Sequence, residues 1–186
     1  MKTVFVIDNV INKEIQDLIE DTLLGPTFAW WKNDDITYPT FTKRKTPKRG
    51  ATFSAKIMDP TSNYYNNDAI KLCHHILEGV CDELNISNMS VIQTRAFLHI
   101  AQPKFLWNRK DTKHTDQDDP HTVILYYVND SDGPTDLFNE KGRVMRSIKP
   151  KKGRCVVFDG SIPHRSTHSK HRDRCIVNFN VSFDSL

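Results

Sequence analysis

The sequence lacks any apolar run close to the about 20 residues that a membrane-spanning helix needs. The apolar stretch Val4–Ile7 near its start is too short for a signal peptide, and no small-residue cleavage site follows it. We therefore expect a cytoplasmic protein without a membrane partner.

A strong charge of one sign and a high cysteine content are also absent. The formal net charge is +3 over 186 residues, which does not by itself drive tight nucleic-acid binding, so no nucleic-acid partner is expected. The dense basic stretch Lys43–Arg49 is typical of a solvated loop, with a lid or a contact to an acidic substrate as the alternative. The four cysteines, Cys73, Cys81, Cys155 and Cys175, lie in apolar patterns, which favours buried thiols over a disulfide framework.

The composition and the first half of the chain predict a globular domain that begins with helices. Hydrophobic residues make up 38% and charged residues 26%, values typical of one soluble domain with a real core. Asn12 is expected to cap a helix that ends at Gly25-Pro26, and an apolar stripe from Ala69 to Leu84 predicts a second helix. Residues 27–60 show no sustained period.

From Ser90 onward the pattern changes to short strands separated by turn signals. The predicted strands are Val91–Ile100, His121–Val128, Arg143–Ile148, Arg154–Phe158 and Arg174–Phe183. This order indicates an α+β protein with a double-stranded β-helix, or jelly roll, and supporting N-terminal helices packed on one sheet. We expect a single domain over residues 1–186, with helical support over about 1–88 and the jelly-roll core over about 89–186.

Two histidines and one aspartate form a candidate metal site. His114 and Asp116 are two residues apart, so on an extended backbone their side chains point to the same side and can bind one ion. The strand Arg154–Phe158 and a turn then lead to His164. Two imidazoles and one carboxylate make the facial triad of non-haem Fe(II) oxygenases. The opposite face of the ion would have room for a 2-oxo acid and for dioxygen.

Arg174, which opens the last predicted strand, fits the charge of such a site. A doubly negative 2-oxo acid beside Fe(II) and Asp116 still needs a cation for its distal carboxylate, and a guanidinium meets a carboxylate with two hydrogen bonds. Tyr127 is positioned to add a hydroxyl to the same carboxylate. We expect the strand of Arg174 to run beside the one that carries His164, with Arg172 as the nearby competitor for this role.

The stretch from His114 to Val181 resembles the core of the 2-oxoglutarate/Fe(II) dioxygenases, and within them the prolyl-4-hydroxylase-like branch. The matching residues are His114-Thr115-Asp116, His121–Asn129, Gly133–Phe138, Pro150–Phe158, His164 and Arg174. The resemblance implies a hydroxylase that uses Fe(II), 2-oxoglutarate and dioxygen and forms succinate and carbon dioxide. It is also compatible with ascorbate as a further reductant. In that family the tyrosine before an aliphatic–asparagine pair faces the co-substrate, which maps to Tyr127 rather than Tyr126.

Two departures limit what the resemblance implies about the substrate. Many relatives have Gly-Gly-Glu/Asp-Thr where this chain has Asp132-Gly133-Pro134-Thr135, and Ala101–Lys113 lacks the common tyrosine–glycine pattern. A peptidyl proline, a free amino acid and another small molecule therefore remain open. The sequence indicates no oligomeric state.

Two other classes of function remain as alternatives. Alkylated-nucleic-acid demethylases of the same superfamily carry a second arginine six residues after the co-substrate arginine, where this chain has Asn180. A cupin-like metal-binding or sugar-binding module would share the fold without oxygenase activity. Metal-dependent decarboxylation of 2-oxoglutarate separates that module from an enzyme.

The remaining histidines are expected to lie outside the site. His168 and His171 fall in a polar loop and are predicted to be exposed to solvent. His74 and His75 follow Cys73 on the second predicted helix, whose apolar face already uses Cys73, so they are expected on its flank rather than in a zinc site.

The sequence does not assign a single role to Arg95 or to the tryptophan pair Trp30 and Trp31. Arg95 lies on the predicted strand before the first metal ligands. Its position fits a contact to the co-substrate or the substrate, and it fits an exposed residue of that strand equally well. Trp30 and Trp31 are adjacent, so one is expected in the core and the other at the surface, with an aromatic substrate platform as the alternative.

Overall fold

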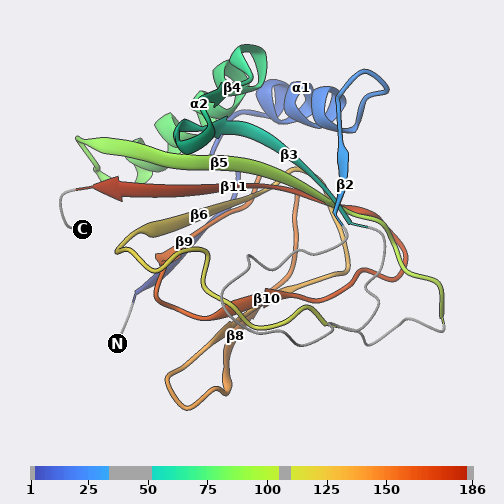
Figure 1. Ribbon diagram of the computed structural model, residues 1–186, viewed down its shortest axis with the longest axis vertical. Helices are drawn as coiled ribbons and strands as arrows, with labels where there is room; N and C mark the ends of the chain where they lie inside the picture. Colours follow the sequence, from blue (N-terminus) through green and yellow to red (C-terminus); the bar gives the residue numbers. More distant parts are fainter. Residues whose placement is uncertain (1–2, 34–51, 105–109, 184–186) are drawn as a thin grey trace.

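The fold has two helices and two antiparallel sheets, as seen in the computed structural model (Figure 1). The structure describes residues 3–33, 52–104 and 110–183, so the basic stretch Lys43–Arg49 lies outside the described residues. None of the described helices is long and apolar enough to cross a membrane.

The large sheet has the strand order β1-β9-β6-β11-β5-β3-β2, with β4 paired to β3. Its strands are β1 (Val4–Ile7), β2 (Trp31–Asn33), β3 (Thr52–Asp59), β4 (Tyr64–Tyr65), β5 (Met89–His99), β6 (Thr122–Tyr127), β9 (Cys155–Asp159) and β11 (Arg174–Phe183). A one-turn 3-10 helix, Pro60–Ser62, joins β3 to β4. Strand β11 has both edges occupied, by β5 and by β6, and is therefore central to the sheet.

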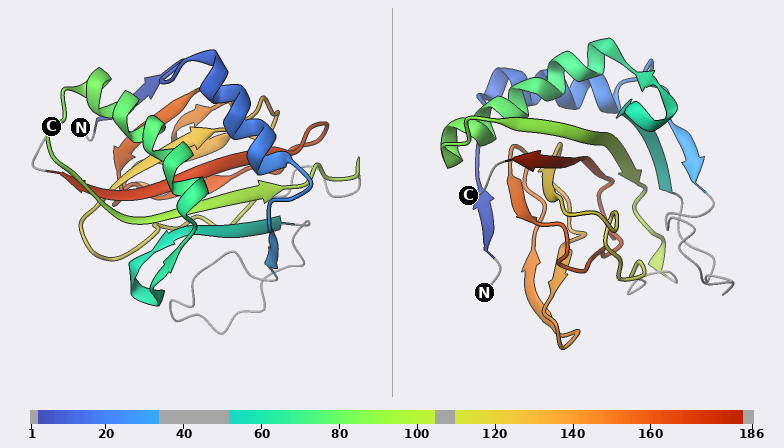
Figure 2. Two further views of the ribbon diagram at one scale, coloured as in Figure 1. Left: turned by 90° about the horizontal axis from the view of Figure 1, so that it is seen from above. Right: turned by 60° about the vertical axis from the view of Figure 1, so that its left-hand side comes forward.

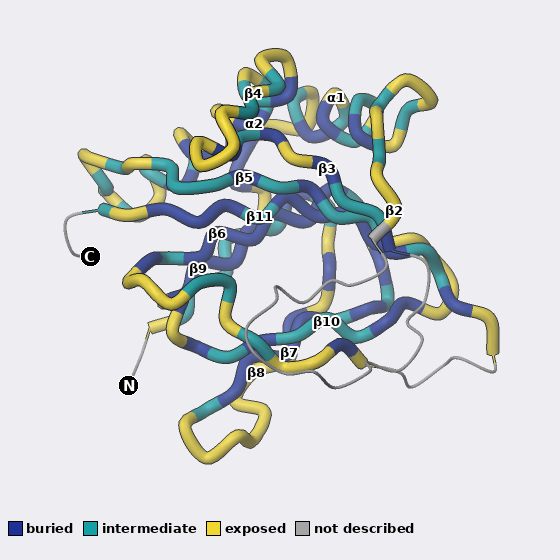
Figure 3. Tube along the Cα trace, viewed as in Figure 1, coloured by how far each residue is buried: buried dark blue, intermediate teal, exposed yellow. Residues whose placement is uncertain are grey.

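The small sheet has the order β10-β7-β8 and faces the large sheet (Figure 2). Its strands are β7 (Thr135–Phe138), β8 (Val144–Ile148) and β10 (His164–Ser166). Apolar side chains from both sheets, such as Leu137 on β7 and Ile176 on β11, meet in one buried cluster between them. The hairpin at β8 extends away from this cluster, and residues 140–147 are exposed (Figure 3). This is the jelly-roll fold that the sequence predicted.

Both helices cover the face of the large sheet that points away from the small sheet (Figures 1 and 2). Helix α1 (Lys13–Leu24) begins where the side chain of Asn12 accepts a hydrogen bond from the amide of Ile15 at 3.0 Å. Helix α2 (Asn67–Leu84) begins in the same way at Asn66. Their apolar faces join the outer face of the sheet in a second core cluster. The predicted helices and their packing on one sheet are confirmed.

The alternation of side chains along β6 separates two adjacent tyrosines. Tyr126 belongs to the cluster under the helices, whereas Tyr127 belongs to the cluster between the sheets. A strand sends successive side chains to opposite faces, so only one member of such a pair can enter the barrel. Tyr127 is thus the member of the pair that points into the barrel.

Several strands have no counterpart among the elements expected from the sequence. Strands β2 and β3 fall in the segment without a period, and β2 to β4 lie within the first 88 residues, where helical support was expected. Strands β7 and β10 are only four and three residues long. Such short strands owe their conformation to pairing with each other, a long-range contact that local patterns do not reveal. The four cysteines are free, as predicted.

The turn that leads to His164 requires glycine at position 160. A Cβ there would lie 2.2 Å from Nε2 of His121, whose carbonyl accepts a hydrogen bond from the amide of Gly160 at 2.8 Å. We expect Gly160→Ala to lower the free energy of unfolding by about 1–3 kcal/mol, as overpacked sites do. Urea unfolding of Gly160→Ala, His121→Ala and the double variant measures this. An equal cost of Gly160→Ala with and without the His121 ring would contradict the steric explanation.

Candidate functional site

His114, Asp116 and His164 come together in the structure, although 48 residues separate the last two. Each offers one ligand atom, and these atoms all lie within 4.8 Å of one another. The backbones of His114 and His164 pair directly, with amide-to-carbonyl distances of 3.0 and 2.9 Å in the two directions. Asp116 lies two residues further, and its Oδ1 is 3.6 Å from Nε2 of His114 and 3.4 Å from Nε2 of His164. Within the described ranges no other group of three such residues is found.

Backbone carbonyls hold both imidazoles in one tautomer. Nδ1 of His114 is 2.9 Å from the carbonyl oxygen of Thr112, and Nδ1 of His164 is 3.2 Å from that of Ile162. A carbonyl can only accept, so in the neutral ring Nδ1 carries the proton and Nε2 presents a lone pair. Both lone pairs therefore face the carboxylate of Asp116. This is how metal-binding histidines are oriented in general.

Asn178 fixes the carboxylate of Asp116 from the side of the large sheet. Its Nδ2 donates to Oδ2 of Asp116 at 2.8 Å, which leaves Oδ1 toward the histidines. Burial alone would raise the pKa of Asp116, but the imidazoles of His114 and His164 hold it well below its usual range. Burial would likewise lower the pKa of His114, yet the Asp116 carboxylate and the Thr112 carbonyl raise it. The aspartate is thus ionised and available as a ligand at neutral pH.

The donor set fits a divalent transition metal. In non-haem Fe(II) sites, two imidazole nitrogens and one carboxylate oxygen bind one side of the ion, and coordination positions on the other side stay open. His164 is 8% exposed, and its ring contacts that of Phe158 at a centroid distance of 5.2 Å, which limits its motion. The residues present are therefore suited to hold such an ion.

Arg174 forms the second part of the site. It is 1% exposed, and its guanidinium donates to the hydroxyl of Thr135 at 2.8 Å and to that of Ser166 at 3.1 Å. Tyr127 donates to the same Thr135 hydroxyl at 2.7 Å. Nε of Arg174 has no partner, and no carboxylate pairs with this arginine among the described residues. A buried cation without a counter-charge is costly, so the cluster is suited to an anionic ligand.

The position of Arg174 in the fold differs from the prediction in one respect. Its burial in the barrel is as expected, but β11 does not run beside β10, the strand of His164. The two strands lie in opposite sheets, because β5 and β6 already occupy both edges of β11. The long side chain of Arg174 crosses the space between the sheets to reach Ser166 on β10. The competitor Arg172 is exposed.

Three residues of the site were missed by sequence reasoning. These are Thr135 and Ser166, which contact the arginine, and Asn178, which contacts the aspartate. The alternation along β11 could have revealed Asn178, since residues four apart on a strand share a face. Thr135 and Ser166 carry no local signal, because they face Arg174 from the other sheet.

The other histidines are placed partly as expected. His171 is exposed, and His74 and His75 are exposed on α2, as predicted. The prediction for His168 is wrong: it is 4% exposed, and its Nε2 lies 3.3 Å from Oδ1 of Asp111, which is also buried. A polar contact to a residue 57 positions earlier offsets part of the cost of burying the ring, and a polar local sequence does not indicate such a partner.

One tryptophan of the pair packs in the core and the other lies at the surface, as expected. The indole of Trp30 donates to the carbonyl of Leu23 at 3.0 Å and packs against the core, whereas Trp31 is 53% exposed.

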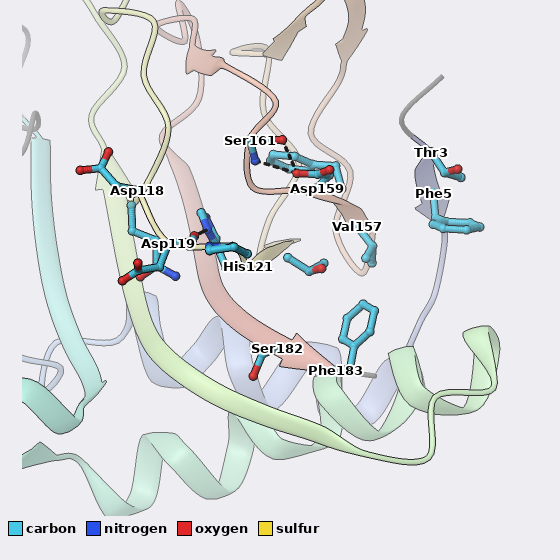
Figure 4. A pocket seen from close by; sticks show the side chains of 14 residues that line it. Thr3, Phe5, Asp118, Asp119, His121, Val157, Asp159, Ser161, Ser182 and Phe183 are labelled. Carbon is cyan, nitrogen blue, oxygen red and sulfur yellow. Dashed lines mark hydrogen bonds between the residues drawn. The ribbon is translucent and has the colours of Figure 1, made fainter. Parts of the chain in front are cut away.

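A separate cavity of about 720 Å³ lies at the ends of β6, β9 and β11 (Figure 4). Its lining includes the carboxylates of Asp118, Asp119 and Asp159 and the rings of Phe5 and Phe183, but none of the metal-site residues. Three carboxylates repel an acid such as 2-oxoglutarate. This cavity is therefore distinct from the site described above.

The comparisons with known proteins agree with this geometry. Residues 99–182, which include the histidines, the aspartate and Arg174, match the family model described as the 2OG-Fe(II) oxygenase superfamily. No curated protein matches the chain in sequence.

Solved structures with the same fold come from several enzymes. A viral collagen prolyl hydroxylase from Paramecium bursaria Chlorella virus-1 has a TM-score of 0.59 at 14% identity, over 96% of this chain and 94% of that one. An oxidoreductase of the 2OG-Fe(II) oxygenase family from Burkholderia pseudomallei has a TM-score of 0.68 at 9% identity, over 96% and 84%. The epimerase SnoN from nogalamycin biosynthesis has a TM-score of 0.62 at 9% identity, over 98% and 79%.

Residues 99–182, the part of the chain that holds the candidate site, therefore resemble the 2OG-Fe(II) oxygenase superfamily, and the chain shares the fold of the solved structures above. The matched segment contains the His114, Asp116 and His164 cluster and Arg174, the residues suited to an Fe(II) ion and to an anionic co-substrate such as 2-oxoglutarate. The similar structures include both hydroxylases and an epimerase, so the fold leaves the reaction on the substrate open.

Proposed function

We propose that His114, Asp116 and His164 bind Fe(II), that Arg174 and Tyr127 bind 2-oxoglutarate, and that the enzyme hydroxylates a C–H bond of its substrate. The substrate is a peptidyl proline, an amino acid or another small molecule, and residues 1–186 act as one catalytic domain. The observation that carries this proposal is a cluster of three ligand atoms within 4.8 Å of one another, in the same barrel as a buried arginine that has no carboxylate partner among the described residues.

Each residue has a distinct task in this reaction. Nε2 of His114, Nε2 of His164 and Oδ1 of Asp116 hold the ion from one side, and the Thr112 and Ile162 carbonyls keep the rings oriented. The Arg174 guanidinium takes the distal carboxylate of 2-oxoglutarate. When bound, Fe(II) supplies the redox chemistry by which 2-oxoglutarate and dioxygen become succinate, carbon dioxide and one hydroxyl oxygen on the substrate.

The co-substrate end of the site also involves two neutral groups. The hydroxyls of Thr135 and Tyr127 lie beside the guanidinium, within reach of the same carboxylate. Burial raises the pKa of Tyr127, so its hydroxyl keeps its proton and can donate it in a hydrogen bond. The surrounding cluster of apolar side chains excludes water from this end of the barrel and strengthens the charge pairing.

Two residues favour hydroxylation over other activities of the superfamily. Halogenation requires a small residue in place of the metal-binding carboxylate so that halide can bind iron, and here that position is Asp116. The position of the second arginine of the nucleic-acid demethylases is Asn180, which is 4% exposed and carries no charge for a phosphate.

The direct test uses the purified protein with Fe(II), 2-oxoglutarate and dioxygen. Succinate formation is measured without substrate and then with peptides and free amino acids in parallel, and products are examined for the mass of one added oxygen. We expect iron-dependent decarboxylation that a substrate stimulates. A protein that binds the metal but forms no succinate under any of these conditions is a binding module and not a hydroxylase.

We expect Asn178→Ala to weaken Fe(II) binding by about 10- to 100-fold, the usual cost of losing a group that orients a metal ligand. Without the 2.8 Å hydrogen bond, the Asp116 carboxylate can rotate away from the histidines. Competition with a chelator measures the affinity, and thermal unfolding reports the stability. Asn139→Ala, which removes an asparagine of the β7–β8 hairpin, is the matched control. Equal affinities in both variants would show that Asn178 does not position the aspartate.

A further inference from the structure

The segment that carries His114 pairs with β10, the strand that carries His164. In the small sheet, β7 occupies one edge of β10. Residues 110–114 run antiparallel along the other edge, where backbone bridges join Lys110 to Thr167 and His114 to His164. The position of one metal ligand therefore depends on how this segment is aligned with the strand of another.

The two bridges differ in register by one residue. They lie four positions apart on residues 110–114 and three positions apart on the opposing strand, so the segment holds one residue more than the strand it faces. Such an extra residue bends a strand and re-aims a side chain. Because the amide of Asp111 bonds to the carbonyl of Ser166 at 3.0 Å, the extra residue falls between Asp111 and His114. This stretch includes Thr112, whose carbonyl oxygen lies 2.9 Å from Nδ1 of His114 and orients the ring.

A buried contact between two side chains stabilises the first part of this pairing. Asp111 is 5% exposed and His168 is 4% exposed, and Oδ1 of Asp111 lies 3.3 Å from Nε2 of His168. If the segment straightened, by extending the register of the His114–His164 bridge to its beginning, Asp111 would shift by one position and turn to the opposite face of the strand. Both polar groups would then be buried without this contact, which is costly, so the contact favours the register with the extra residue.

We propose that Asp111 and His168 are positioning residues of the metal site, because their contact holds the extra residue in place and keeps the Thr112 carbonyl against the ring of His114. This inference rests on the proposed binding of Fe(II) by His114. Neither Asp111 nor His168 belongs to the group of three ligand residues, so the pair acts on the ion only through His114. A metal-binding imidazole depends on the partner of its other nitrogen for its tautomer and its orientation. Loss of the contact should therefore weaken metal binding without removing a ligand.

The test measures metal affinity in variants of the pair. In anaerobic competition with a chelator, Asp111→Ala and His168→Asn should each bind Fe(II) about 10- to 100-fold more weakly than the parent, the usual cost of losing a group that orients a metal ligand. The amide of His168→Gln reaches the position of Nε2, which the shorter amide of His168→Asn does not, so His168→Gln should recover most of the affinity. His171→Asn changes an exposed histidine of the same loop and is the matched control.

A double-variant cycle separates positioning from a general loss of stability. His168→Asn is combined with His114→Ala, and the parent, both single variants and the double variant are titrated with Ni(II), which sites of this donor type bind more tightly than Fe(II). We expect His168→Asn to cost about 10- to 100-fold in the parent background and to cost nothing further once the His114 ring is absent. At saturating Co(II), the visible spectrum of His168→Asn should shift toward that of His114→Ala, whereas His171→Asn should keep the parent spectrum.

Parent-like affinity in both His168→Asn and Asp111→Ala would overturn the positioning role, and so would an equal loss from His168→Asn with and without the His114 ring. If Asp111→Ala does not fold, the contrast between His168→Asn and His168→Gln decides between these results. Failure of the proposed metal site looks different, because the parent protein would then bind no divalent metal, or would bind it equally well after His114→Ala.

Discussion

Asp116→Ala and His164→Ala are each expected to reduce substrate oxidation by more than about 100-fold, beyond the usual cost of losing a group that only orients a ligand. A three-residue site that loses one donor has only two left, and the ion then dissociates or shifts. Asp116→Glu should also be severely impaired, because the longer side chain moves the carboxylate away from both histidines. Chelator competition gives the Fe(II) affinity of each variant, and succinate formation at limiting and saturating iron gives the activity.

Two controls separate a lost metal ligand from a damaged fold. His171→Ala removes an exposed histidine that lies outside the cluster and should behave as the parent protein. Circular dichroism and urea unfolding should show the triad variants folded, with His164→Ala less stable because its ring packs on Phe158. Tight Fe(II) binding and full activity in Asp116→Ala would mean that a carboxylate elsewhere is the third ligand.

Arg174→Ala is expected to raise the 2-oxoglutarate requirement by orders of magnitude while the Fe(II) affinity stays nearly unchanged. Loss of one partner of a buried charge pair costs about 3–5 kcal/mol, which corresponds to about 100- to 4,000-fold in affinity. Arg174→Lys should recover only part of this loss, because an ammonium cannot form two parallel hydrogen bonds to a carboxylate. Titration of 2-oxoglutarate against succinate formation measures the effect.

Arg172→Ala is the matched control for the arginine. Its side chain is exposed, two residues before Arg174, and its loss should leave the 2-oxoglutarate requirement near that of the parent. A normal requirement in Arg174→Ala together with a large loss in Arg172→Ala would transfer the role to Arg172. No loss in either variant would remove the basis for 2-oxoglutarate binding at this cluster.

Local patterns in the sequence predicted the helices and most of the long strands. The choice of Tyr127 over Tyr126 came from the family resemblance, and the alternation of side chains along β6 places the two rings on opposite faces of the sheet. The spacing of His114 and Asp116 has the same local basis, since an extended backbone points both side chains to one side. Asn12 predicts the start of α1, because a capping side chain bonds to an amide only three residues away.

Pairings between distant segments were decided only by the tertiary structure. The position of β10 opposite β11, the contact of Ser166 with Arg174 and the burial of His168 against Asp111 each join residues that belong to different segments of the chain. Hydrogen bonds and ion pairs depend on which groups meet in space, whereas a local pattern reports only the face on which a residue lies. The sequence therefore determined the residue types of the site and their orientation, and the packing of the two sheets determined their partners.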